Sequence, residues 1–316
     1  MARISSTEID GIRLKNLMLA GSKWLSHHRA YLDKINFFPV PDGDTGSNLY
    51  LTLAAVCAKL RNLDRSPRAG DVAKEAAMGA LMGSKGNSGI ILAQYFRGFS
   101  ESIGSKKVIH AKDIAEALVK AAETARAGVH NPREGTILSV ARDGAKSCSK
   151  NVKKNAQIIS VLVAYYESAK LSLERTKNSL PELKKAKVVD SGAYGLVLIF
   201  EGMLRFATGV PFKTTPKILG VKPARGSGKI KKIRHRFCTS FLMIKKRGVS
   251  DSKVLAALKK HGDSVVLDRG INNISKVHLH TNSPDILLEK ASELGKLENV
   301  NIEDMVEQAA ARRRKK

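Results

Sequence analysis

The chain has 316 residues, of which 43% are hydrophobic and 5% aromatic, so it is long enough for two domains with cores of mainly Ala, Leu, Ile and Val. It contains no run of about 18 apolar residues and no cleavable apolar leader, which argues against a membrane span and a secretory signal. The three cysteines, Cys57, Cys148 and Cys238, are few and far apart, which fits a reducing compartment and predicts a cytoplasmic protein.

The formal net charge is +26, and a charge of this size raises nucleic-acid binding as one interpretation. The sequence contains no zinc finger, aromatic-rich strand motif or helix-turn-helix signature to accompany it. The charge therefore favours a basic surface, or one that meets an acidic partner, over a nucleic-acid-binding module.

Residues 1–206 predict a helical domain. Apolar residues recur at spacings of three and four in residues 12–32, 49–60, 114–127 and 188–206. Four glycine-bearing turns each lead directly into an apolar helical run, and they read FPVPDGDTGSN, GSKGNSG, HNPREGT and VVDSGAYG. A turn that opens a helix exposes free backbone N–H groups, which suit phosphate.

The composition changes after this domain. Residues 207–235 contain three prolines and the segment ARGSGK and predict a linker, and no acid but thirteen Lys and Arg occur from residue 202 to 250. Residues 236–316 predict a small α+β domain, with strands at FCTSFLMI and KVHLHT and helices at 252–260 and 284–294. The end, AAARRRKK, predicts a frayed basic tail.

The segment NFFPVPDGDTGSN contains the strongest indication of chemistry. Asp42 and Asp44 flank Gly43, and two carboxylates so close repel each other unless a cation lies between them. Oxygen ligands of this kind suit Mg²⁺, which bridges nucleotide phosphates. A surface Asp-Gly turn is the alternative interpretation. A calcium loop is excluded because the spaced acids and the closing Glu are missing.

The other three turns indicate little when each is taken alone. GSKGNSG, residues 83–89, matches neither the P-loop nor the dinucleotide fingerprint, and a flexible loop is its simpler interpretation. The same holds for REGT, residues 133–136, and DSGAYG, residues 190–195.

Taken in order, the four segments carry a family resemblance. INFFPVPDGDTGSN, GSKGNSGIILAQ, REGTILSVAR and VVDSGAYGLVLIFEGML resemble the nucleotide-binding domain of the fatty acid kinase catalytic subunit, which is similar to the nucleotide-binding subunit of dihydroxyacetone kinase. The resemblance spans residues 8–206 and continues through CTSFLM, KVHLHTNSPDILLEKASELGKL and NIEDM into the family's middle domain. It implies an antiparallel helical barrel whose loops at one end hold ATP through two Mg²⁺ ions.

The resemblance also implies roles for single residues. Asp42 and Asp44 match the metal-binding, catalytic aspartates, and Asn36 lies near a third metal-ligand position. The remaining matches belong to the phosphate loop and to further nucleotide contacts: Thr45, Gly46, Ser47, Asn48, Asn87, Ser88, Gly89, Thr136, Asp190, Ser191 and Gly192.

A second constellation lies in the α+β domain. His278 and His280 are two apart on a predicted strand and so face one side, and Cys238 on another strand could add a thiolate. From spacing alone, two solvent-facing histidines are the alternative. The family's middle domain carries a Cys and an HxH at matching places that bind zinc, so the resemblance implies one structural Zn²⁺. The groups His27, His28 and Lys34, and Glu303 and Asp304, are interpreted as solvated surface.

The resemblance implies transfer of the γ-phosphate of ATP to a fatty acid carboxylate, presented by a separate DegV-like fatty-acid-binding protein. A carboxylate is already ionised at neutral pH, so no strong general base is needed. A dihydroxyacetone-type kinase and a non-catalytic nucleotide-binding regulatory or nucleic-acid-binding protein are the alternatives. The family normally continues into a third domain that helps to dock the carrier, and it often dimerises. Since the sequence ends after the middle domain, we expect either a separate docking subunit or a different mode of docking.

Overall fold

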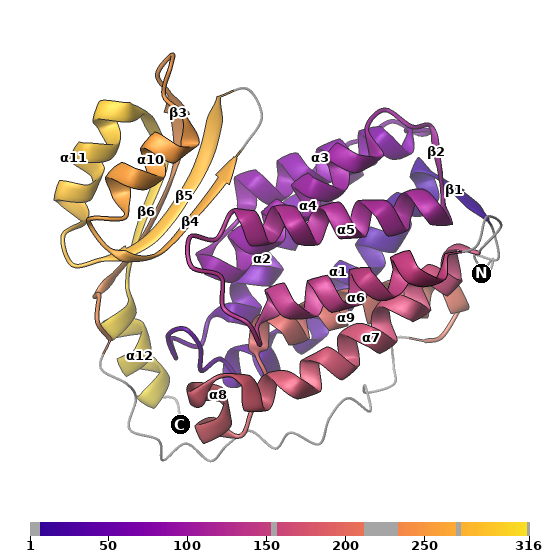
Figure 1. Cartoon of the computed structure of the whole chain (residues 1–316), viewed down its shortest axis with the longest axis horizontal. Coiled ribbons are helices and arrows are strands. Elements are labelled where there is room, and N and C mark those ends of the chain that lie inside the picture. Colours follow the sequence, from indigo (N-terminus) through magenta and orange to yellow (C-terminus); the bar gives the residue numbers. More distant parts are fainter. Residues whose placement is uncertain (1–6, 153–156, 212–232, 270–272, 315–316) are drawn as a thin grey trace.

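The structure, a computed structural model, describes residues 7–152, 157–211, 233–269 and 273–314. It contains a large helical domain and a smaller domain built on a sheet, which sits against one end of the helices (Figure 1). In the described residues, no helix combines the length and the apolar character that a membrane span requires. The expected linker falls mostly on residues 212–232, which lie outside the described residues.

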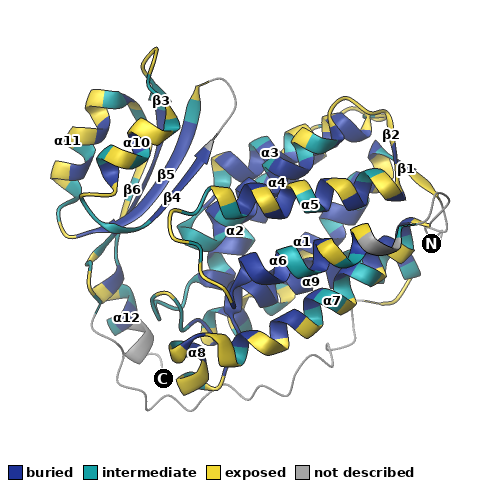
Figure 2. Ribbon diagram, in the orientation of Figure 1, coloured by how far each residue is buried: buried dark blue, intermediate teal, exposed yellow. Residues whose placement is uncertain are grey.

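The helices of the first domain form a closed ring. Each helix packs on the next from α1 to α7, α7 packs on α9, and α9 packs back on α1, while the short α8 lies beside α7. The buried residues face the interior of this ring (Figure 2). This confirms the expected helical barrel. The bounds are α1 (Gly11–Lys34), α2 (Thr45–Arg61), α3 (Ala69–Gly83), α4 (Gly86–Ile103), α5 (Ala111–Ala127), α6 (Ile137–Asn151), α7 (Ile158–Ser179), α8 (Pro181–Ala186) and α9 (Ser191–Thr208).

The ring explains why four separate motifs meet. Neighbouring helices joined by short loops run in opposite directions, so every second connection falls at the same end. The α1–α2, α3–α4, α5–α6 and α8–α9 connections carry the four glycine-bearing turns. At the other end of the ring, β1 (Glu8–Asp10) pairs antiparallel with β2 (Val108–His110).

The second domain is a four-stranded antiparallel sheet in the order β4-β5-β3-β6. Two helices cover one face over a core that includes Phe241, Val265 and Val277, and the third follows the last strand (Figure 1). The expected strands are confirmed as β3 and β5. The bounds are β3 (Phe237–Lys245), α10 (Asp251–Leu258), β4 (Asp263–Arg269), β5 (Ile274–Thr281), α11 (Pro284–Leu294), β6 (Gly295–Asp304) and α12 (Met305–Arg314).

The C-terminal segment differs from the expected frayed tail, because α12 continues as far as Arg314. Asp304 caps this helix by accepting hydrogen bonds from the backbone N–H groups of Val306 and Glu307, at 2.9 and 3.1 Å. Asp304 also pairs with Arg236 at 2.7 Å. It is therefore a helix cap rather than an ordinary surface acid.

The uncovered face of the sheet turns towards the helical domain. Backbone hydrogen bonds join the α5–α6 loop to the edge strand β4, from His130 N–H to Val265 C=O and from Leu267 N–H to Gly128 C=O, each at 3.3 Å. The buried Gln94 side chain of α4 donates to the Leu267 carbonyl at 2.9 Å. These contacts hold the small domain over the end of the ring where the four turns meet.

Candidate active site

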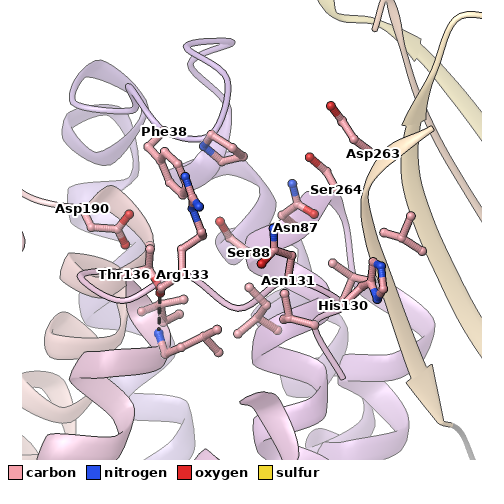
Figure 3. Close-up of a pocket in the computed structure, with 18 of the residues that line it drawn as sticks. Phe38, Asn87, Ser88, His130, Asn131, Arg133, Thr136, Asp190, Asp263 and Ser264 are labelled. Carbon is pink, nitrogen blue, oxygen red and sulfur yellow. Dashed lines mark hydrogen bonds between the residues drawn. The ribbon is translucent and has the colours of Figure 1, made fainter. Parts of the chain in front are cut away.

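The largest cavity, of about 560 Å³, lies between the four turns and the small domain. In Figure 3, Thr136 and Asp190 lie on one side of it, and Asp263 and Ser264 of the small domain lie opposite. This volume falls within the range typical of small-molecule and cofactor sites. Residues from both domains line it, among them Phe38, Asn87, Ser88, Thr136, Asp190, Gly192, Arg234, Asp263 and Ser264.

Asp42 and Asp44 line a smaller pocket of about 20 Å³, which shares Pro39, Asn87 and Ser88 with the large cavity. Gly43 between them has a φ of 78°, a left-handed conformation that favours glycine. Burial raises the pKa of Asp44, hydrogen bonds with Asp42 and Asn48 oppose this shift, and the charges of Glu303 and Asp33 add to it. A site that gathers carboxylates around a buried one suits a divalent cation.

Asn36 organises the turn that carries these aspartates. It is 1% exposed, and its side-chain oxygen accepts hydrogen bonds from the backbone N–H groups of Asp44 and Thr45 and from the Thr45 hydroxyl, at 3.0 to 3.2 Å. Its amide donates to the Val40 carbonyl at 3.0 Å. The structure thus gives Asn36 a role in holding the loop, and its expected role as a metal ligand stays a prediction without geometric support.

The start of α2 is tied to α1 rather than left open. The backbone N–H and the hydroxyl of Ser47 donate to the two carboxylate oxygens of Asp33, at 2.8 and 2.7 Å. A Cβ on Gly46 would lie 2.2 Å from the Arg29 carbonyl oxygen, so this glycine permits close packing of α2 on α1. The structure therefore explains Gly46 and Ser47 by packing and does not point them at a ligand.

The start of α4 faces both the large cavity and the smaller pocket. Asn87 and Ser88 line the two. The side-chain oxygen of Asn87 is buried and has no hydrogen-bond partner among the described residues. A buried polar atom in this state indicates a ligand or water that is bound there. Gly89 instead packs on α2, since a Cβ there would lie 2.5 Å from the Thr52 hydroxyl.

The starts of α6 and α9 complete the wall of the large cavity. Thr136 caps α6 and donates its hydroxyl to the Arg133 carbonyl at 2.8 Å. Asp190 caps α9 by accepting from the Ala193 N–H at 2.7 Å, and burial raises its pKa to about 6. Ser191 is turned away from the cavity, because its hydroxyl donates to the Leu32 carbonyl on α1 at 2.7 Å.

Cys238, His278 and His280 lie together on the face of the sheet that meets the helical domain. Their ligand atoms are all within 4.8 Å of one another, and all three residues are buried. Burial raises the pKa of the Cys238 thiol, lowers that of His278 well below its usual value and lowers that of His280 to about 4. Neutral imidazoles and a thiol that needs a nearby cation to ionise form a donor set typical of zinc.

The position of this cluster differs from that of an isolated structural site. All three residues line the same small pocket as Asp42 and Asp44. His278 Nε2 is buried without a hydrogen-bond partner among the described residues. A metal on these three residues would therefore face the paired aspartates of the helical domain.

Two carboxylates of this region were not predicted from the sequence. Glu303 was interpreted as an ordinary surface acid, but it is half-buried and pairs with Lys85 at 3.2 Å, and its charge acts on both Asp44 and Cys238. Asp33 lies at the end of α1 and holds the start of α2. No local pattern marks either residue, because each reaches the site through the tertiary fold.

The chain is similar to known protein families over most of its length. Residues 39–205 match the DAK2 domain, and residues 234–312 match the FakA-like middle domain of fatty acid kinases. It is 36% identical to protein YloV of Bacillus subtilis and 33% identical to an uncharacterized protein of Staphylococcus saprophyticus, in each case over 96% of this chain. The chain spans 57% and 56% of the lengths of these two relatives.

Among solved structures, the native dihydroxyacetone kinase of C. freundii aligns with a TM-score of 0.49 and 18% identity, over 65% of this chain and 36% of that one. Its complex with AMP-PNP and Mg²⁺ aligns with a TM-score of 0.47 over the same shares. The two family matches confirm the resemblance carried by the ordered motifs. The chain belongs to the DAK2 family and carries the FakA-like middle domain of fatty acid kinases.

Proposed function

We propose that this chain is the nucleotide-binding, catalytic part of an ATP- and Mg²⁺-dependent phosphotransferase. The observation that carries the proposal is the placement of Asp42 and Asp44 in a pocket that shares its wall with the 560 Å³ cavity. The unpartnered Asn87 oxygen lies in the shared wall, which supports a bound ligand at this junction. The nucleotide base and sugar would occupy the cavity, and the phosphates would extend towards the aspartates.

Asp42 and Asp44 would hold Mg²⁺, which supplies charge neutralisation for the phosphates. Two further carboxylates, Asp33 and Glu303, act on Asp44 from the helical domain and the small domain. Four acids in one region suit more than one divalent cation, in keeping with the expected pair of Mg²⁺ ions. The backbone N–H groups at the start of α4, which face the pocket, would add donors for phosphate oxygens.

The acceptor we propose is a fatty acid carboxylate. Its oxygen attacks the γ-phosphorus, a new P–O bond forms, and the bond from the γ-phosphorus to the bridging oxygen of ADP breaks. The products are an acyl phosphate and ADP. A carboxylate carries no proton at neutral pH, so the residues here need only position the groups and balance charge.

A fatty acid is poorly soluble, so we propose that a DegV-like fatty-acid-binding protein presents it. Since the chain spans 57% of its relative from Bacillus subtilis, the surface that docks this carrier belongs to the same proposal and is assigned to a further segment or a separate subunit. Cys238, His278 and His280 would hold Zn²⁺, which would place positive charge beside the phosphates and keep one coordination position open.

The test is nucleotide turnover with purified chain, Mg²⁺ and ATP. We expect Mg²⁺-dependent binding of AMP-PNP, and ADP formation that requires a long-chain fatty acid together with its carrier. Turnover of dihydroxyacetone without a carrier would contradict the fatty acid assignment. Binding of nucleic acid with no nucleotide binding under any condition would contradict the phosphotransferase itself.

A further inference from the structure

The small domain contains a second set of cavities that the nucleotide does not need. One is a groove of about 510 Å³, built from the small domain alone, which we call the basic groove, and it is lined by Arg234, His235, Lys259, Lys260, His261 and Ile286, among others. The side chains of Asn87, Thr136 and Asp190, which face the nucleotide cavity, are not part of it. Its surroundings are therefore chemically distinct from the proposed ATP site.

The basic groove connects to the paired aspartates. A cavity of about 200 Å³ shares Arg234 and His235 with the groove, and it reaches inward as far as His280. His280 in turn lines the small pocket that contains Asp42 and Asp44. The groove, this cavity and the pocket thus form one path from the surface of the small domain to the proposed site of transfer.

The charge along this path is strongly positive. Arg234, Lys259 and Lys260 bring three cationic side chains, and within the part of the chain that the structure describes none of the three forms an ion pair. The acid among the lining residues, Asp263, faces two imidazoles instead, with its oxygens 3.5 Å from His235 Nε2 and 3.7 Å from His280 Nδ1. Unpaired cations around a cavity attract an anionic group.

The mouth of the groove adds an apolar element. The Ile286 side chain, at the start of α11, is 46% exposed and lines the groove. A ligand with a carboxylate at one end and a hydrocarbon chain behind it would meet the cations first and leave its chain near Ile286. Neutral or purely polar molecules have no such match.

The chemistry of phosphoryl transfer requires a second route. The attacking and leaving oxygens lie roughly in line on opposite sides of the transferred group, so the acceptor cannot enter by the path that the nucleotide fills. We propose that the basic groove is the entry site for the acceptor, and that it binds the carboxylate end of a fatty acid. This inference rests on the proposed function, because it takes the large cavity to be the ATP site.

Lys260 is the residue with which to test the groove, because it lines the groove and not the nucleotide cavity, and its exposed position tolerates substitution. The matched control is Lys253 on α10, which is exposed in the same domain and lines none of these cavities. The variants are Lys260→Glu, Lys260→Arg and Lys253→Glu in the full chain. The probes are octanoate and the neutral octanamide, measured by saturation-transfer NMR with Mg·AMP-PNP present.

We expect the parent to bind octanoate and not octanamide. Lys260→Glu should weaken octanoate binding about tenfold, since a charge reversal next to the carboxylate replaces attraction by repulsion. Lys260→Arg and Lys253→Glu should bind octanoate as the parent does, and all variants should bind Mg·AMP-PNP equally.

Equal octanoate binding by Lys260→Glu and the parent would overturn the groove assignment, and so would no octanoate binding by a parent that holds Mg·AMP-PNP. Both outcomes leave the nucleotide site intact. Octanoate binding that depends on Lys260 in a protein unable to bind Mg·AMP-PNP would instead overturn the proposed function and retain the groove as a carboxylate site.

Discussion

Lys85 at the start of α4 and Glu303 on β6 are separated by 218 residues in the sequence, and their side chains meet at an Nζ–Oε1 distance of 3.2 Å. The pair joins the two domains next to the paired aspartates. Exposed ion pairs add little to stability, so its importance lies in the charge that it places near Asp44.

Glu303→Gln tests this charge. The substitution keeps the shape of the side chain and removes one of the negative charges that act on Asp44, so Mg²⁺ affinity should fall about three- to tenfold in a calorimetric titration with ADP present. The free energy of unfolding should change by no more than about 0.5 kcal/mol. Glu75→Gln, which breaks the Lys59–Glu75 pair away from the site, is the control and should leave Mg²⁺ affinity unchanged.

Asp42→Asn and Asp44→Asn should each leave the fold intact and weaken Mg²⁺-dependent binding of AMP-PNP by about tenfold or more, because each removes a charged oxygen ligand. Asp44→Asn should also melt at the same or a higher temperature at pH 7. Burial raises the pKa of Asp44, so its ionised form costs stability that a neutral amide does not. Asp64→Asn, at an exposed loop position, is the control. Unchanged Mg·AMP-PNP binding in both site variants would remove these aspartates from the site.

The Cys238, His278 and His280 cluster should bind about one zinc ion per chain, as measured by elemental analysis of the purified protein. Cys238→Ser should lose most of this metal, and chelation should lower the melting temperature of the parent. His110→Ala, which removes an exposed imidazole at the far end of the ring, should keep it. Purified parent that contains no zinc and melts at the same temperature with and without a chelator would contradict the assignment.

The buried Asp190 should give the protein a pH-dependent stability. Burial raises its pKa to about 6 in the folded chain, above the usual 3.8 of an unfolded aspartate. The folded state therefore binds more protons between these values, and this contribution to stability is lost as the pH rises from about 4 to about 6. The loss is on the order of 1–3 kcal/mol.

Asp190→Asn retains an N-cap oxygen and cannot ionise, so its stability relative to the parent should increase between pH 4.5 and pH 7.5. Melting temperatures of both proteins at the two pH values measure this change. Asp10→Asn exchanges the N-cap of α1 outside the cavity and separates the effect of capping from that of burial. A constant difference between the Asp190 variant and the parent across this range would show that the carboxyl is not held as described.

Two glycines of the motifs should respond in opposite ways to alanine. A Cβ on Gly46 would meet the Arg29 backbone at 2.2 Å, so Gly46→Ala should destabilise the fold by about 2 kcal/mol. At Gly192 the nearest atoms would be 3.4 Å or more away, so Gly192→Ala should keep the melting temperature within a few degrees. Its methyl group would project beside Asp190 and Ser88 and should weaken AMP-PNP binding. Equal melting temperatures for the two variants would contradict this division.

Much of the helical ring could be predicted from the sequence, because apolar residues at helical spacing mark α1, α2, α5 and α9 within a few residues of their observed ends. The same spacing does not mark α3, whose Gly- and Ala-rich sequence gives little contrast between its faces. Its small residues serve close packing instead, since a Cβ on Gly79 would lie 2.8 Å from the Ala55 carbonyl oxygen. The edge strand β6 also lacks alternation, with Val300 and Ile302 both exposed.

The candidate site could be predicted where its residues are neighbours in sequence. Asp42 and Asp44 stand in one turn, and their mutual repulsion is visible from their spacing. Asp33 and Glu303 reach the same region only through the packing of α2 on α1 and of β6 beside β3. For the same reason His28 was interpreted as solvated, whereas its ring packs edge-on against Trp24 at 4.7 Å and burial lowers its pKa.

The closure of α9 on α1 has a consequence for the order in which the chain is made. Helix α1 leaves the ribosome first, but the surface against which it packs belongs to the last helix of the ring, so its apolar side waits for the rest of the domain to be synthesised. Trp24, the one tryptophan of the chain, lies in this seam with 1% of its surface exposed, where a Cβ on Gly202 of α9 would come within 2.6 Å of its own Cβ. Its fluorescence therefore reports the moment at which the ring closes.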